Sequence, residues 1–201
     1  MTRYRSRVST LVSDRRIHRS RSVATFASRE FTTLRPRLTV SAVPSKIAAI
    51  AGDPSYTSMR ASVYQDISIA PFDVHFFHSI LEEDKYEAFE LYGHVNKTEA
   101  TGFIHFGDKL CGHDGVVHGG CIATMFDEFI VMTMLWTEGT VGFTANLSVN
   151  YHKPLLPRTS GIVHLELAKK EGRKVFYKAS LVDDDGTLYS DATSLYILPR
   201  H

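Results

Sequence analysis

Residues 113–129 read HDGVVHGGCIATMFDEF, and this stretch contains two features that oppose burial in a helix. Glycine is a poor helix former, and a carboxylate is costly to remove from water. Gly119 and Gly120 nevertheless open a long apolar run, and Asp127 interrupts it. Both features therefore need a structural or chemical reason.

The apolar run from residue 119 to about residue 136 predicts a helix. Strands rarely exceed about 10 residues, so the run is too long for one. A helix that is apolar on all sides is typically buried. The apolar positions are Ile122, Ala123, Met125, Phe126, Phe129, Ile130, Val131, Met132, Met134 and Leu135.

The sequence after this helix predicts a series of strands. Residues 141–152 alternate strictly between apolar and small or polar side chains, which is typical of a half-buried strand. Pro154 and Pro157 follow and end it. The other predicted elements are a strand at 101–106, two strands within 161–182 around a turn at 171–172, a hairpin turn at 183–186 and a last strand at 187–198.

This order of elements indicates an α+β fold in which an antiparallel sheet wraps around one long central helix. We expect three regions along the chain. Residues 1–46 form a leader, residues 47–98 form a linker with an N-terminal helical segment that starts near Phe77, and residues 99–201 form the folded domain.

The leader differs from the rest of the chain in charge. Residues 1–46 contain eleven basic and two acidic residues, a net charge of +9, whereas the remaining 12 basic and 20 acidic residues give −8. An Arg- and Ser-rich segment with few acids is typical of a mitochondrial transit peptide. A basic arm for nucleic acid or anionic lipid is the alternative. Such an arm usually contains Lys too, and none precedes Lys46. Import into the mitochondrial matrix is therefore favoured, and no nucleic-acid partner is expected.

Two further properties narrow the class of protein. No uninterrupted apolar run approaches the roughly 20 residues that cross a bilayer, so no transmembrane segment is expected. Cys111 and Cys121 are too few for a disulfide framework, which is consistent with a reducing compartment.

Three interpretations of Asp127 compete. It could lie on a solvent-facing stripe with Glu128 and Thr124, but the helix has few polar residues for such a stripe. It could be a buried structural carboxylate held by hydrogen bonds. It could also be a catalytic base or nucleophile in an apolar pocket.

The glycines bear on this choice. A helix N-terminus has unpaired N–H groups and a partial positive charge, and a glycine there lets a substrate carbonyl approach. Gly119 and Gly120 could thus form an oxyanion-type donor, or simply a tight turn into the helix. Gly119 and Asp127 lie about 12 Å apart along one helix, too far to act on one carbonyl. If both are catalytic, two antiparallel copies of the helix are needed, hence a dimer with paired sites.

Several motifs together resemble the hotdog-fold acyl-CoA thioesterases of the phenylacetyl-CoA thioesterase type, most nearly their mitochondrial branch. The motifs are GVVHGG with Asp127 after six further residues, TANLSVNYHKPL, EGRK and TLYSDATSLYIL. The resemblance covers about residues 101–198. It implies a sheet wrapped around a helix, hydrolysis of acyl-CoA in fatty acid metabolism, and a homodimer or dimer of dimers with sites at the interface.

The resemblance also implies roles for individual residues. The N–H of Gly119 would polarise the thioester carbonyl, and Asp127 of the partner chain would activate water or attack directly. His118 would support the loop, and Thr144 would position Asp127 or the water. The substrate-binding candidates in the same motifs are Gly120 and Asn146.

Basic residues near strand ends are further candidates. Lys153, Arg173 and Lys174 could bind the phosphates of coenzyme A, although solvated strand ends and turns often carry such charges. Many relatives have an Asn before the HGG motif, and Gly112 occupies that position here. His113, Asp114 or a backbone group would have to replace it.

Other chemistries are less well supported by the sequence. Cys111, His113, His118 and Cys121 match no common zinc spacing, so neither a metal nor another cofactor is expected. Cys121 at a helix N-terminus could instead be a nucleophile with His118. A non-catalytic hotdog dimer that binds acyl-CoA or a protein, or a hydratase on the same fold, are the remaining alternatives.

Overall fold

The computed structural model describes residues 43–59, 75–113 and 115–200. Its main sheet has seven strands in the order β1-β2-β3-β7-β8-β9-β6, and every neighbouring pair is antiparallel. The strands are β1 (Tyr56–Ser58), β2 (Tyr86–His94), β3 (Glu99–Phe106), β6 (Phe143–Tyr151), β7 (Thr159–Glu171), β8 (Lys174–Val182) and β9 (Leu188–Ile197). The remaining elements are α1 (Ser45–Ala51), η2 (His78–Ile80), η3 (Asp108–Leu110), α3 (Gly119–Glu138) and a small sheet of β4 (Cys111–His113) and β5 (Val116–Val117).

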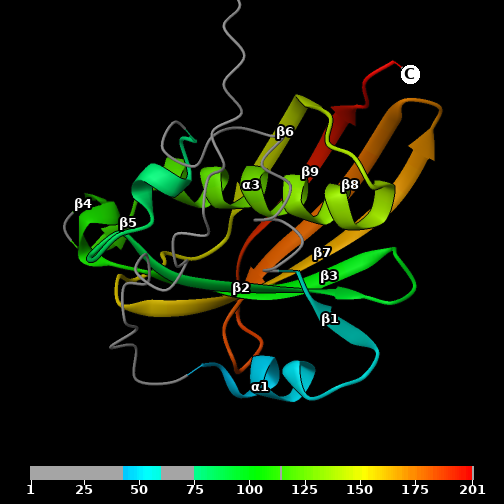
Figure 1. The fold of residues 1–201 in the computed structure, drawn as a ribbon. Coiled ribbons are helices and arrows are strands. Elements are labelled where there is room, and N and C mark those ends of the chain that lie inside the picture. The colour runs from blue at the N-terminus through cyan, green and yellow to red at the C-terminus, as the bar shows by residue number, and fades with distance from the viewer. Residues whose placement is uncertain (1–42, 60–74, 114, 201) are drawn as a thin grey trace, which may run out of the picture. The chain divides into compact units, whose positions relative to one another are not determined.

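Helix α3 lies across one face of the main sheet, as Figure 1 shows. It begins after the N-cap residue His118 and ends at Gly139, whose φ of 69° suits a glycine C-cap. The predicted central helix is thus confirmed. In the described part of the chain, α3 alone has the length and apolar character that a bilayer crossing requires, but it packs against the sheet as a core helix. Its fully buried residues are Ile122, Met125, Phe126, Phe129, Ile130, Met132, Thr133 and Met134.

A second, smaller core lies on the opposite face of the sheet. There α1 covers Phe103 and Ile162 with the fully buried side chain of Ile47. The free N–H groups at the start of α1 are capped from a distant loop, because both Ser45 and Lys46 donate backbone hydrogen bonds to the carboxylate of Asp184. The predicted leader ends within this helix, and residues 1–42 lie outside the described part.

The predicted helical segment near Phe77 is wrong. The chain forms only the short turn η2 and then enters β2, which pairs with β3. From Tyr86 onward the pattern follows a strand, with Tyr86 and Leu91 buried. The acids at residues 82–84 precede this strand and do not form the polar face of a helix. Strands β1 and β2 belong to the main sheet, so the folded domain begins before residue 99, its predicted boundary.

Strand β6 forms one edge of the main sheet, since it pairs with β9 on one side only. The sequence predicts this strand, but it also predicts that its apolar side chains are buried. In the structure Phe143 is 77% and Tyr151 52% exposed. The prediction of burial is wrong for the single chain, because an edge strand has no neighbour to cover its outer residues.

Candidate active site

The carboxylate of Asp127 is half-buried and held by two strands. Its Oδ1 accepts one hydrogen bond from the Thr144 hydroxyl of β6 at 2.9 Å and another from the Tyr196 hydroxyl of β9 at 2.6 Å. The Tyr196 hydroxyl also lies 3.2 Å from the Asp127 carbonyl oxygen. Two hydrogen bonds to strands of the sheet anchor this carboxylate, which favours the second and third of the three interpretations over a solvent-facing stripe.

Tyr196 is a site residue that the sequence did not reveal. It lies 69 residues from Asp127, and in the alternating pattern of the last strand it looks like any buried aromatic. Burial, followed by the hydrogen bond and charge of Asp127, raises the pKa of Tyr196. The hydroxyl therefore keeps its proton and acts as a donor to the carboxylate.

Glu128, the next residue on α3, is a second half-buried carboxyl group. Burial and the neighbouring charge of Asp127 raise its pKa to about 7. His75 Nε2 lies 3.7 Å from Glu128 Oε1, and burial lowers the pKa of His75. Burial thus opposes charge on both partners, so we do not regard this contact as a full ion pair at neutral pH.

At the start of α3, a single residue satisfies most of the free N–H groups. The His118 ring accepts from Gly120 N–H at Nδ1, at 2.8 Å, and the His118 carbonyl accepts from Cys121 and Ile122. Among the described residues, none accepts a hydrogen bond from Gly119 N–H. The helix N-terminus therefore presents one free donor, at the position where the sequence places the oxyanion donor.

The His118 ring also explains why Gly112 replaces the expected Asn. A Cβ atom at residue 112 would lie 2.4 Å from the His118 ring. Gly112 therefore leaves room for the ring that caps α3. Because Nδ1 accepts a hydrogen bond, it carries no proton, and the ring acts here as a cap.

Tyr151 contacts the same end of α3 from the far end of β6. Its hydroxyl donates to the Gly119 carbonyl at 2.8 Å, and a Cβ on Gly119 would lie 3.2 Å from its ring. A side chain at this position would therefore require the Tyr151 ring to shift slightly, whereas a glycine leaves the ring in place and the backbone accessible.

The structure disfavours the alternative in which Cys121 is the nucleophile. Burial raises the pKa of the Cys121 thiol, so it is poorly suited to act as a thiolate. In the described ranges, no group of three or more His, Cys, Asp or Glu side chains is arranged to hold a metal ion.

A single chain does not bring the remaining candidates together. Asn146 is exposed on β6. Lys153 follows the end of β6, where its N–H donates to Tyr189. Arg173 and Lys174 lie beside Leu198 and Ile197, near the start of β6. Since β6 has nine residues, roughly 30 Å separates its two ends.

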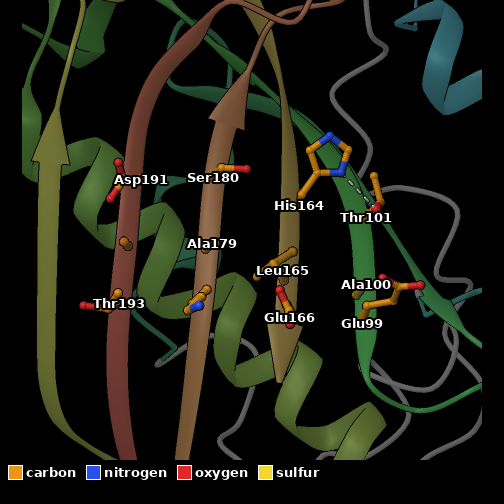
Figure 2. Close-up of a pocket in the computed structure, with 12 residues that line it drawn as sticks. Glu99, Ala100, Thr101, His164, Leu165, Glu166, Ala179, Ser180, Asp191 and Thr193 are labelled. Carbon is orange, nitrogen blue, oxygen red and sulfur yellow. Dashed lines mark hydrogen bonds between the residues drawn. The ribbon is translucent and has the colours of Figure 1, made fainter. Parts of the chain in front are cut away.

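A hollow of about 350 Å³ lies on the face of the sheet away from α3, as Figure 2 shows. None of the predicted site residues lines it. Two of its polar groups are hydrogen-bonded, Thr101 to His164 at 3.3 Å and Asp191 to Asn150 at 2.8 Å. The predicted catalytic residues lie instead at α3 and β6.

The fold is a hotdog fold, and its candidate site combines the free N–H of Gly119 with the hydrogen-bonded carboxylate of Asp127. Residues 114–190 match the family model of the thioesterase superfamily. The crystal structure of thioesterase superfamily member 2 from Mus musculus has the same fold, with a TM-score of 0.57 and 17% identity over 70% of this chain and 95% of that one.

Two curated relatives extend the comparison. The acyl-coenzyme A thioesterase THEM4 of Mus musculus is 39% identical over 112 residues, which are 54% of this chain and 48% of the relative. A protein of Candida albicans named as mitochondrial and uncharacterized is 32% identical over 84 residues, 41% of this chain and 38% of that protein. The chain thus matches half or less of the length of these two relatives.

Proposed function

We propose that this protein hydrolyses acyl-CoA thioesters to the free acid and coenzyme A, as a homodimer. The observation that carries the proposal is the pairing of a free Gly119 N–H with an anchored Asp127, in a fold whose mouse relative is named an acyl-CoA thioesterase. The two groups lie about 12 Å apart on one helix, so the proposal requires a second copy of the chain.

The open edge of β6 supports a particular dimer. A twofold axis would pair β6 with its copy in antiparallel fashion, so that the start of one strand lies beside the end of the other. Thr144 and Asp127 belong to the start of β6, and Tyr151 and Gly119 to its end. This pairing would complete two sites and cover the exposed Phe143 and Tyr151.

The chemistry then follows from the two groups. The Gly119 N–H polarises the thioester carbonyl and stabilises the oxyanion that forms on it. Asp127 of the other copy either takes a proton from the attacking water or attacks the carbonyl carbon itself. In the first case the tetrahedral intermediate expels the coenzyme A thiolate, which receives a proton. In the second the carboxylate displaces the coenzyme A thiolate, which takes up a proton, to form an acid anhydride, and water then hydrolyses the anhydride to the free acid and restores Asp127.

The same dimer would gather the basic candidates. Lys153 lies at the end of β6, and Arg173 and Lys174 lie near its start. In an antiparallel pair of β6 strands, Lys153 of one copy would therefore lie at the same end as Arg173 and Lys174 of the other copy. Three cations at one end of each site would suit the phosphates of coenzyme A.

For localisation we propose the mitochondrial matrix. The Arg- and Ser-rich composition of residues 1–46 supports import, and the Candida albicans relative is named as mitochondrial. Fractionation of cells that express the tagged chain, with protease treatment of intact and opened mitochondria, would test the compartment. Tag signal outside the mitochondria would contradict it.

The proposed activity is tested by offering the full chain a panel of short, long and aromatic acyl-CoAs and measuring the free thiol released. We expect hydrolysis of at least one class. We expect Asp127→Asn to lose about 10²- to 10⁴-fold of the rate while its far-UV circular dichroism and melting temperature stay near those of the wild type. An active Asp127→Asn variant would exclude the assigned role of this carboxylate. Thermal stabilisation by acyl-CoA without any turnover would favour the non-catalytic dimer.

A further inference from the structure

The two hydroxyl groups that bind Asp127 approach the same oxygen. Thr144 and Tyr196 both donate to Oδ1, at 2.9 and 2.6 Å. Among the described residues, none donates a hydrogen bond to Oδ2. The carboxylate is therefore asymmetric, with one oxygen bound by the protein and the other available.

The two donors differ in how firmly they are held. Thr144 is exposed on the edge strand, whereas Tyr196 is fully buried on β9. The Tyr196 ring packs against the ring of Tyr177, with 6.2 Å between their centroids in an edge-on arrangement. A rigid aromatic donor fixes both the position and the rotation of the carboxylate, and a single exposed hydroxyl cannot do so alone.

We infer that Tyr196 is a positioning residue, which holds Oδ1 of Asp127 so that Oδ2 is the oxygen that takes the proton from water or attacks the thioester. This inference rests on the proposed function, because it assigns a role within that reaction. Tyr196 does not touch the substrate. It acts by keeping the reacting carboxylate oriented and in one rotamer.

The structure offers a matched control for the loss of a buried tyrosine hydroxyl. Tyr177 lies on β8 next to Tyr196, is equally buried, and its hydroxyl makes a 2.7 Å hydrogen bond to Thr137 on α3. Tyr177→Phe therefore removes a similar bond between the sheet and α3 without touching Asp127. Any difference between the two variants reports on the carboxylate and not on packing.

The experiment compares Tyr196→Phe with Tyr177→Phe in the full chain, using an acyl-CoA that the wild type hydrolyses. We expect Tyr196→Phe to lower kcat by about ten- to a hundredfold with KM within about twofold, because hydrogen bonds to charged groups are strong. Tyr177→Phe should keep kcat within about twofold. Thr144→Val, at an exposed position where folding is not at risk, should lower kcat in the same direction as Tyr196→Phe.

A pH profile provides a readout that packing alone would not change. Among the described residues, the polar groups around the carboxylate are Tyr196, Thr144 and Glu128, and Glu128 in turn contacts His75. Because Glu128 titrates near pH 7, the profile is measured in a Glu128→Gln background. There Tyr196→Phe should move the acid limb of kcat to higher pH, since a carboxylate that loses a donor is more easily protonated.

Two results would overturn the inference. One is that Tyr196→Phe leaves kcat equal to that of the wild type and, in the Glu128→Gln background, leaves the acid limb where it lies in Glu128→Gln alone. The other is an equal loss of kcat in Tyr177→Phe, which would make the effect one of packing. A wild type that hydrolyses no acyl-CoA would overturn the proposed function itself, so the two failures are distinguishable.

Discussion

The two halves of the proposed site lie along the same helix but are built in opposite ways. The glycine half consists of His118, Gly119 and Gly120 with Tyr151, and its functional groups are mostly backbone atoms of consecutive residues. The carboxylate half consists of Asp127, Thr144 and Tyr196 from α3, β6 and β9. A donor at a helix N-terminus needs only local sequence, whereas a positioned carboxylate needs distant strands.

The first prediction disables only the glycine half of the site, and it has the largest expected effect on the rate among the predictions below. Gly119→Pro removes the free N–H, and proline is well tolerated at the first helical position. His118, at φ −61° and ψ 131°, already has the extended backbone that a following proline requires. We expect Gly119→Pro to lose about 10²- to 10³-fold of the rate.

Mixing this variant with Asp127→Asn tests whether the halves come from two chains. After joint refolding, random pairing should restore activity to about one quarter of the wild-type level, because half of the dimers then hold one intact site. The measurement is thiol release from mixed and unmixed samples. If mixing restores nothing while both variants remain dimeric, the shared site is excluded.

The next effect concerns Glu128, which adjoins the carboxylate half. Its pKa in the folded protein is raised to about 7, above its ordinary value of 4.5, so the folded state binds more protons between these pH values. Stability should therefore fall as pH rises from about 4.5 to 7, and then level off. Glu128→Gln should remove this loss and be more stable than the wild type at pH 8 by on the order of 3 kcal/mol, with little difference at pH 4.

Urea unfolding of both proteins at several pH values measures this difference. A constant offset across the whole pH range would show that the carboxyl group of Glu128 is not the titrating group.

A smaller effect is expected from crowding the glycine half. Gly112→Ala places a Cβ 2.4 Å from the His118 ring and should lower the free energy of unfolding by about 1–3 kcal/mol. Gly52→Ala is the matched control, since the added Cβ would be in ordinary contact at 3.6 Å. In a His118→Ala background, where the ring is absent, Gly112→Ala should cost much less.

The smallest effect is the loss of the helix cap itself. His118→Ala removes the acceptor for Gly120 N–H and should lower the free energy of unfolding by about 1 kcal/mol. Because Gly119 N–H is not bound by His118, the rate of hydrolysis should fall less than in Gly119→Pro. A loss of rate as large as in Gly119→Pro would instead assign His118 a direct part in the reaction.

The elements that were predictable from the sequence share a strong, local pattern. The long apolar run yields α3, strict alternation over residues 141–152 yields β6, and clear turns delimit β7, β8 and β9. The sequence around Phe77 predicts a longer helix than the structure forms, because its acids and apolar residues mimic a helical face over a few residues. The pairing of β2 with β3 decided its conformation.

For the site, the sequence by itself determined the free donor and the candidate base. His118-Gly119-Gly120 ahead of a buried helix places an N–H at its start, and Asp127 stands out as a carboxylate in an apolar run. Only the tertiary structure decided that Tyr196 binds Asp127, that Gly112 makes room for the His118 ring, and that β6 is an open edge. Those outcomes depend on which strands become neighbours, and strand order is set by packing over the whole sheet, which no local pattern contains.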